Sequence, residues 1–241
     1  MNQKQYITEA NVKHKLLAVI LSLAMIITMC PSVVFAVDDG EQNSSSAAVD
    51  ITESRIIVSN ADDLAALGGK EVKGTIELAG NIDMSGTSME PIKELDGVFE
   101  GNGYAIANLS LSGEAGAAWN APNLGLGLIG SLKGEVRNLQ VLHVSISTSS
   151  IRNVYAGAIA GLIDGGNSSL TNCSASGTIT LPTNSTMNYA GGLIGGITGG
   201  GAVEVKDCLS EVNVTSGTYP GGMVGALQYS SSLTMKNCLV L

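Results

Sequence analysis

The sequence predicts an all-β fold, a right-handed parallel β-helix of about 30–35 residues per coil with a short N-terminal capping helix. Apolar residues alternate within the repeated units, as at Val212 and Val214, which is the period of a strand. Glycine, asparagine and serine interrupt these units too often for a helix of about ten residues. The third observation is a repeat, whose recurring Asn or Asp residues are separated by 30, 34, 35 and 30 residues: Asn108, Asn138, Asn172, Asp207 and Asn237.

A repeat of this length also occurs in helical solenoids, leucine-rich repeats and propellers. The absence of room for a helix excludes the first two. A propeller blade needs four strands in about 40 residues, whereas three short strands fit this unit better. We therefore expect each copy to form one coil that stacks on the next at about 4.8 Å.

Stacking gives each recurring residue type a role. Inward-facing aliphatic residues are expected at Val136, Leu170, Val205 and Met235. A neighbouring inner column is expected at Leu139, Cys173, Cys208 and Cys238, with free thiols acting as small buried hydrophobes. The Asn/Asp residues suit a repeated bend, because their side chains tolerate left-handed backbone and can form ladders. Small residues where the backbone bends or approaches the next coil are expected at Gly161, Gly195 and Gly225.

These segments resemble the GLUG-motif repeats of bacterial cell-surface proteins. The resemblance lies in Gly191-Gly192-Leu193-Ile194-Gly195, in Val205-Lys206-Asp207-Cys208 and in the Gly101–Leu109 segment, and it covers roughly residues 56–241. Such repeats also occur in the non-catalytic N-terminal region of IgA-cleaving metallopeptidases. The resemblance implies a scaffold and a location at the cell surface, and it implies no particular ligand or reaction.

The N-terminal residues have the features of a secretory targeting signal. Lys13 and Lys15 precede an apolar run that ends at Met29, and Val34-Phe35-Ala36 fits a cleavage site, so residues 1–36 are predicted to be a secretory signal peptide. An uncleaved membrane anchor and a lipoprotein site at Cys30 are less favoured alternatives. The acidic and serine-rich residues 37–54 are predicted to be a disordered leader, and residues 55–241 the β-helix.

The β-helix is expected to begin with a short helix capped by Ser59, with Asp62 at its third position and Gly68-Gly69 after it. Strands follow around Ile76 and Ile82. At the other end, the last coil has two of its three strands before Leu241, so we expect it to continue or to be covered by a partner.

Charge limits the partners. Removal of residues 1–36 leaves nine basic and 20 acidic residues, a net charge of −11. An acidic surface argues against nucleic acid, and it leaves contact with a membrane only through an uncleaved signal.

No catalytic, cofactor-binding or metal-binding residues are predicted. His143 is the only histidine after the signal, and there is no His-Glu-x-x-His. Gly125 to Gly130 match Gly-x-Gly-x-x-Gly, but these glycines belong to the repeat and no helix follows. Carboxylates at Glu94, Asp96 and Glu100 leave a glycan-degrading β-helix enzyme as a distant alternative.

An aromatic column is the remaining candidate for binding. Tyr155, Tyr189 and Tyr219 each lie shortly before a glycine-rich strand, and with Trp119 they are candidates for stacking on glycans. The competing interpretation is a tyrosine ladder that stabilises the coils. The sequence thus predicts a secreted or surface-displayed, non-catalytic scaffold or adhesion module, which would contact host protein, glycan or cell-wall material. The alternative is the non-catalytic N-terminal portion of a larger surface peptidase of the IgA-cleaving type.

Overall fold

The computed structural model describes residues 51–115, 122–216 and 218–241. The chain divides into two units, Met1–Ser45 and Ser46–Leu241, and all described residues belong to the second. The predicted signal peptide, residues 37–50 of the predicted leader, and Trp119 lie outside the described residues. No helix among the described residues is long and apolar enough to cross a membrane.

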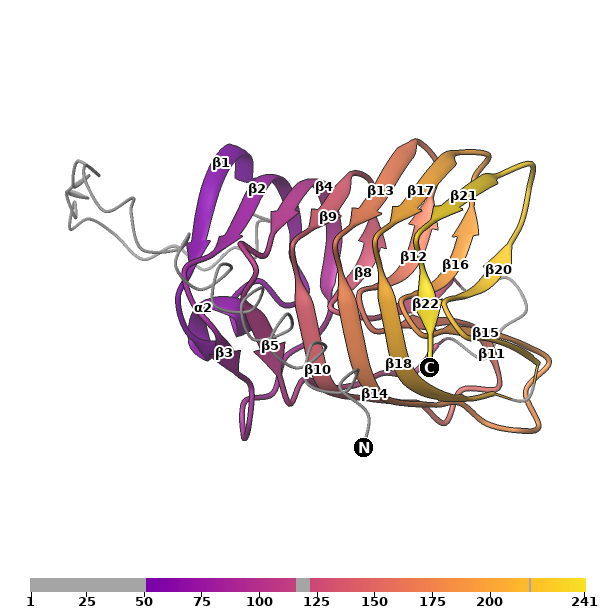
Figure 1. The fold of residues 1–241 in the computed structure, drawn as a ribbon. Helices are drawn as coiled ribbons and strands as arrows, with labels where there is room; N and C mark the ends of the chain where they lie inside the picture. Colours follow the sequence, from indigo (N-terminus) through magenta and orange to yellow (C-terminus); the bar gives the residue numbers. More distant parts are fainter. Residues whose placement is uncertain (1–50, 116–121, 217) are drawn as a thin grey trace, which may run out of the picture. The chain divides into compact units, whose positions relative to one another are not determined.

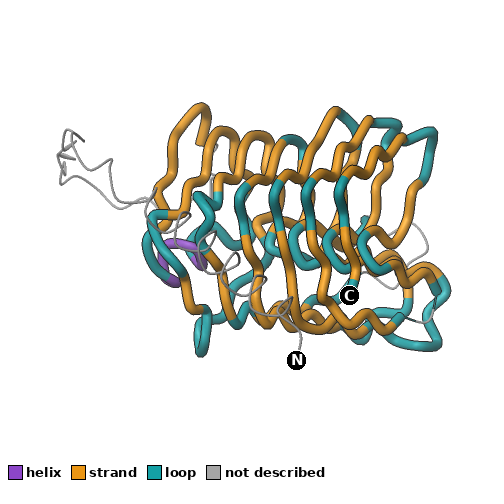
Figure 2. Tube along the Cα trace, in the orientation of Figure 1, coloured by secondary structure: helices purple, strands orange, loops and turns teal. Residues whose placement is uncertain are grey.

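The described unit is a parallel β-solenoid, as predicted (Figure 1). The strands form three sheets, to all of which the later coils contribute, and Figure 2 shows the strands of successive coils lying side by side with the turns aligned. The largest sheet contains β1 (Ile51–Val58), β2 (Glu71–Leu78), β4 (Ile92–Glu100), β8 (Ile129–Leu132), β9 (Glu135–Arg137), β12 (Ala160–Asp164), β13 (Asn167–Thr171), β16 (Ile194–Thr198), β17 (Ala202–Lys206), β20 (Val224–Leu227) and β21 (Ser232–Lys236). The second sheet contains β3 (Ile82–Asp83), β5 (Ala105–Ala107), β6 (Ser110–Ser112), β10 (Gln140–Ser147), β14 (Ser174–Thr180), β18 (Leu209–Thr215) and β22 (Leu239–Val240). The third contains β7 (Leu124–Leu126), β11 (Arg152–Gly157), β15 (Met187–Gly191) and β19 (Tyr219–Gly221).

Strand register places equivalent apolar residues in one column. Val136 pairs with Leu170, Leu170 with Val205, and Val205 with Met235. The first three side chains are fully buried, whereas Met235, on the last coil, is 44% exposed. The predicted inward column is therefore confirmed as far as Val205, and Met235 lies on the last coil that the structure describes.

The earliest coils are shorter than predicted. In the same column Ile56 pairs with Ile76, and Ile76 pairs with Phe99. These steps are 20 and 23 residues, because the third sheet begins only at β7. The coil length of about 30–35 residues therefore applies to the later part of the solenoid.

Strand β4 is continuous where later coils are broken in two. Its first half pairs with β8 and its second half with β9. The break requires close backbone approach: a Cβ on Gly134 would lie 2.0 Å from the Gly97 carbonyl oxygen. The large sheet consequently forks after β4 into two branches, and the β8, β12, β16 and β20 branch forms one wall of the cleft described below.

The predicted helix is present as α2 (Ala61–Ala65), but its cap differs by one residue. The Asn60 side chain, rather than that of Ser59, accepts a hydrogen bond from the Asp63 amide at 2.9 Å. Asn and Ser are comparably good N-caps, so the sequence pattern alone does not distinguish them. Leu64 and Leu67 are buried against the core at the N-terminal end of the solenoid.

Strand β1 was not predicted. It begins at Ile51, inside the segment predicted as a leader through residue 54, and it pairs in parallel with β2. From Ser54 to Val58 it pairs with β2 without a register shift, and the shift lies between Ile51 and Ser54. The ordered solenoid therefore begins before the helix rather than after it.

Candidate ligand-binding cleft

The strands of the third sheet meet the β8 branch at a sharp corner that the repeat glycines make possible. A Cβ on Gly161 would lie 2.4 Å from the Leu126 amide nitrogen, and one on Gly195 would lie 2.4 Å from the Ala156 amide nitrogen. Gly225 is equally close to the Gly195 carbonyl oxygen, at 2.5 Å. Because backbone atoms leave no room for a side chain, the two sheets approach each other here and form the walls of a cleft.

Three tyrosines form one wall of this cleft. Tyr155 pairs with Tyr189 and Tyr189 with Tyr219, and their rings stack with centroids 4.7 and 4.9 Å apart. Tyr155 and Tyr189 are 5% and 7% exposed, while Tyr219 is 50% exposed. The ring faces of the first two are therefore occupied by each other, which supports the ladder interpretation over glycan stacking at those residues.

The tyrosine rings fill the cleft against the opposite wall. A Cβ on Gly196 would lie 2.4 Å from the Tyr155 ring, and Leu162 and Ala226 pack in the same cluster, separate from the main core. The Tyr155 hydroxyl donates to the Gln228 side chain at 3.0 Å. Burial raises the pKa of Tyr155 to about 12, so this phenol stays neutral at physiological pH.

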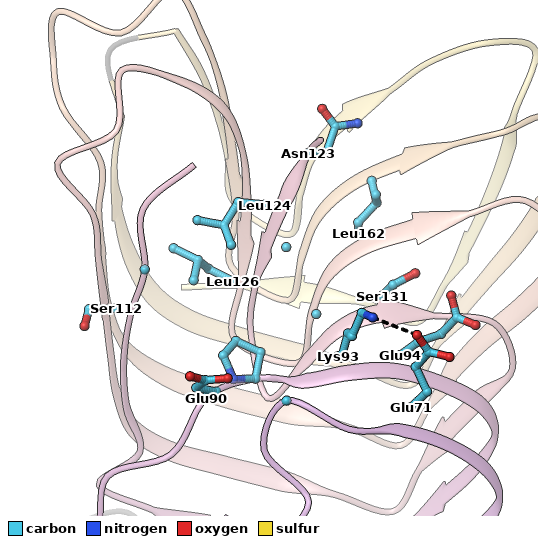
Figure 3. Close-up of a pocket in the computed structure, with 15 residues that line it drawn as sticks. Glu71, Glu90, Lys93, Glu94, Ser112, Asn123, Leu124, Leu126, Ser131 and Leu162 are labelled. Atoms are coloured by element: carbon cyan, nitrogen blue, oxygen red, sulfur yellow. Dashed lines mark ion pairs between the residues drawn. The ribbon is translucent and has the colours of Figure 1, made fainter. Parts of the chain in front are cut away.

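The cleft opens where the tyrosine column stops. Gly125 of β7 is in register with Tyr155, so the preceding coil has no ring at this position. A cavity of about 530 Å³ lies there, within the range of about 300–1,000 Å³ that is typical of ligand pockets. The partly buried Pro91 and Leu124 supply most of its apolar surface, and the buried Leu126 and Leu162 lie behind it. Figure 3 shows the three leucines around the cavity.

Acidic side chains surround the cavity. Glu71, Glu90 and Glu94 line it together with one cation, Lys93. Lys93 Nζ contacts Glu71 at 2.8 Å, and Lys133 Nζ contacts Glu94 at 2.8 Å. The Lys93 ammonium lowers the pKa of Glu71, so this carboxylate is ionised at neutral pH. Glu90 is exposed and forms no ion pair among the described residues.

The predicted Asn/Asp ladder lies elsewhere, at a corner on the other branch of the large sheet. Asn138, Asn172, Asp207 and Asn237 all have left-handed backbone, with φ between 52° and 54°. Asn172 Nδ2 donates to Asn138 Oδ1 at 2.9 Å, and Asn237 Nδ2 donates to Asp207 Oδ1 at 3.0 Å. The Asn and Asp side chains thus form hydrogen bonds between neighbouring coils, as expected for a ladder that stabilises the stack.

Asn108 does not belong to this ladder, although its spacing in the sequence placed it there. Its amide donates to the Leu142 carbonyl, which places it beside His143 in the second sheet. Both residues have positive φ, 59° and 54°, and a register shift between β10 and β14 occurs at His143. The true neighbour of Asn138 on the preceding coil is Gly101, whose amide donates to Arg137. Two different bends use the same residue type, and spacing alone did not separate them.

The cysteines form the predicted inner column as free thiols. Cys173 and Cys208 are 2% and 3% exposed, and Cys238 on the last coil is partly exposed. Each Sγ donates to a carbonyl of the preceding coil, at Val136, Leu170 and Val205 respectively. A hydrogen bond with Cys208, together with burial, raises the pKa of the Cys173 thiol, which keeps it protonated.

Two of the three carboxylates that raised the possibility of glycan hydrolysis, Glu94 and Glu100, pair with cations on the next coil. Glu94 pairs with Lys133, and Glu100 Oε2 accepts from Arg137 Nε at 2.6 Å. Burial alone would raise the pKa of Glu100, but hydrogen bonds from Arg137, Asn138 and Asn102 outweigh it and the pKa is lowered. A glycosidase acid needs a raised pKa. Among the described residues there is also no group of three or more His, Cys, Asp or Glu that could hold a metal ion.

Apart from Glu94, which was considered only as a candidate catalytic carboxylate, the side chains that line the cavity were not singled out from the sequence. Leu124, Leu126 and Glu90 carry no motif, and Gly125 was interpreted only as a repeat glycine. A signal was present, however. Aligning the repeats on their glycine-rich strands places Gly125 where later copies have Tyr155, Tyr189 and Tyr219, so an interruption of the tyrosine column can be read from the sequence.

Fold and cleft together define a parallel β-solenoid with a ligand-sized cavity at one end of an aromatic column. No model of a known protein family matches the chain, and no curated protein matches its sequence. Among solved structures, a similar chain is a Bacteroides ovatus protein described as a "putative immunoglobulin A1 protease". The two share 16% identity over 76% of this chain and 74% of that chain, with a TM-score of 0.39. The solenoid assignment rests on the strand register of this chain and not on that similarity.

Proposed function

We propose that this chain is a secreted or surface-displayed, non-catalytic β-solenoid that works as a scaffold and adhesion module, and that the cleft cavity is its binding site. Its partners would be host protein, glycan or cell-wall material. The observation that carries the proposal is the cavity itself, which has an apolar surface, an acidic rim and walls built from strands in fixed register.

The electrostatics of the rim favour binding over catalysis. Glu71 and Glu94 are held in ion pairs with Lys93 and Lys133, and the pKa of Glu71 is lowered. General acid catalysis by a carboxyl group needs the opposite shift, because the acid must hold its proton at the working pH. Ionised carboxylates on a rigid scaffold are suited to recognising a ligand by charge.

Rigidity supports the same role. Strands β4, β8, β12, β16 and β20 form one wall of the cleft, and stacked tyrosine rings fill it beyond the cavity. A binding site on such a framework loses little conformational entropy when a ligand enters.

Binding can be tested with the full chain and a cavity-filling variant. Purified chain is incubated with insoluble peptidoglycan, with surfaces coated with mucin or fibronectin, and with whole bacterial cells. Ser131 lines the cavity, so Ser131→Trp should reduce retention on the ligand that the wild type binds. Ser169 has similar burial on β13 outside the cavity, so Ser169→Trp should retain it.

Location and activity complete the test. Antibody against the solenoid should detect the chain on intact cells or in the culture medium. Detection only in the cytoplasm would contradict the proposal. Release of peptides or of reducing sugar ends from these materials by the purified chain would replace the adhesion role with an enzymatic one.

A further inference from the structure

We infer that the cavity takes an extended peptide whose residues alternate between apolar and basic, and that this peptide adds as a further strand to the open edge of β7. The inference rests on the proposed binding function and names the ligand class for that site. Three features of the described residues lead to it: an unpaired strand edge, an apolar surface on one side of that strand, and surplus negative charge at the rim.

Strand β7 ends the third sheet. That sheet has the order β19-β15-β11-β7, and within the described part of the chain β7 pairs only with β11. All three of its residues, Leu124, Gly125 and Leu126, line the cavity. A strand at the end of a sheet presents amide and carbonyl groups that an extended peptide can bind by strand addition.

The two sides of β7 differ in chemistry. Figure 3 shows Leu124 and Leu126 extending to one side of the strand, with Lys93 and Glu94 on the other. Side chains of an added strand would alternate between the same two sides. Leu126 is fully buried in the core, so an apolar residue of the added strand would contact the partly buried Leu124. The neighbouring residues of the strand would project toward the charged wall.

The charge of the cavity rim indicates that the peptide residues alternating with the apolar ones are basic. The cavity lining holds three carboxylates and one ammonium group, and Glu71 and Glu94 are already paired with Lys93 and Lys133. Because Lys133 lies outside the lining, Glu71, Glu94 and Lys93 leave one surplus negative charge on the charged wall within the cavity. Glu90 adds another negative charge at the rim, on the leucine side of β7 (Figure 3). The whole chain also has a net charge of −9. Arginine or lysine side chains complement such a rim, and acidic side chains are repelled by it.

A glycan fits the cavity less well. Sugar rings are held largely by stacking on aromatic faces, and no aromatic residue lines this cavity among the described residues. The nearest candidates, Tyr155 and Tyr189, are buried against each other. Strand addition instead uses the backbone groups that β7 leaves unpaired.

Synthetic peptides test the assignment on the full chain. The probe is the peptide acetyl-Val-Arg-Val-Arg-Val-amide. Its binding is measured by NMR from the chemical shifts of the Leu124, Leu126 and Leu162 methyl groups of the protein. We expect saturable shifts of these methyls, and weaker binding at higher salt. The matched peptide with glutamate in place of both arginines should bind much more weakly.

Two N-methylated isomers test the strand geometry. One carries N-methyl groups on both arginines, and the other carries them on the first and last valines. An added strand directs alternate amides toward β7, so one isomer should bind like the parent peptide and the other should lose binding. Equal affinities of the two isomers would overturn strand addition.

The rim is tested with a matched pair of variants. Glu90→Gln should weaken binding of the arginine peptide by about two- to fivefold, as expected for one exposed charge pair. Asp96 is exposed on β4 and lies outside the cavity lining, so Asp96→Asn should leave the affinity unchanged. Equal weakening by both variants would show that only net charge matters and would overturn the assignment to this cavity.

A glycan probe separates this inference from the proposed function. If chitotriose shifts the three leucine methyls and the arginine peptide does not, the peptide assignment is wrong while the binding role stands. If no probe shifts them, the peptide assignment is wrong, and the retention experiment with Ser131→Trp decides the binding role independently.

Discussion

Gly125 lies directly in register with Tyr155, and this one pairing converts a filled cleft into a cavity. From Tyr155 onward every coil places a ring in the cleft, and the rings stack 4.7 and 4.9 Å apart. At Gly125 the backbone itself prevents a side chain, because a Cβ there would lie 2.0 Å from the Gly130 carbonyl oxygen. The corner geometry of the early coil therefore maintains the opening.

This steric relationship predicts that Gly125→Ala destabilises the solenoid. The added methyl group must displace the Gly130 backbone, which we expect to cost about 1–3 kcal/mol in free energy of unfolding. Gly80 is the control, because a Cβ there meets nothing within 4 Å, and Gly80→Ala should change stability by less than about 1 kcal/mol. Urea denaturation measures both, and equal effects would refute the steric account.

The tyrosine column should contribute to stability through ring stacking. Tyr189 lies between two rings, so Tyr189→Leu removes both stacking contacts and should cost about 1–3 kcal/mol. Tyr104 is 38% exposed and outside the stack, so Tyr104→Leu should cost less than about 0.5 kcal/mol. A small effect at Tyr189 would mean that the stacked rings follow from coil spacing without strengthening it.

Acid should weaken the corner at Glu100. Hydrogen bonds from Arg137, Asn138 and Asn102 lower the pKa of this carboxylate from 4.5. A carboxylate with a lowered folded-state pKa adds stability above its unfolded pKa, and that stability is lost as pH falls through the folded value. Unfolding free energy should therefore fall as pH drops below about 4.5.

Glu100→Gln isolates this contribution. The substitution should cost about 1–3 kcal/mol at neutral pH, because hydrogen bonds to a charged group are lost, and it should flatten the acid limb of the stability curve. Glu211 is exposed and has no ion pair among the described residues, so Glu211→Gln is the control. An unchanged acid limb in Glu100→Gln would assign the pH dependence to other groups.

Ser210 is a polar residue where the column calls for an apolar one. It pairs with Ala175 on the preceding coil, and its hydroxyl is buried without a hydrogen-bond partner in the described part of the chain. Removing an unpaired buried hydroxyl should help, so Ser210→Ala is expected to raise the free energy of unfolding by about 1 kcal/mol. A loss of stability in thermal or urea unfolding would show that the hydroxyl is satisfied in solution.

The sequence was sufficient for the fold because solenoid packing is repetitive. Each column of like residues, such as Val136, Leu170 and Val205, reports the register several times over, and a single misread residue changes little. The errors arose where the repeat is imperfect. Asn108 had the right spacing but belongs to a different bend, and β1 carries no repeat at all.

The cavity was harder to predict for a related reason. Its residues come from β2, β4, β6, β7, β8, β12 and the loops between them, and together they form no motif along the chain. The site exists because Gly125 has no side chain where later coils have a tyrosine. This difference can be recognised only once the coils are aligned in register. Glu90 and Leu162 acquire a shared role only through that three-dimensional arrangement.

The central claim is that successive coils stack in register, and a distance between the first and last rungs tests it most directly. Arg55 and Thr234 are exposed members of one column, linked through Thr75, Val98, Glu135, Ser169 and Glu204. Six steps of about 4.8 Å place their backbones about 29 Å apart.

The measurement is a double electron–electron resonance experiment on spin labels at Arg55→Cys and Thr234→Cys, with the four native cysteines replaced by alanine. We predict one narrow distribution centred near 29 Å, broadened by the label linkers. A distribution without a defined maximum, or one centred far above that distance, would contradict the stacked solenoid and with it the cleft.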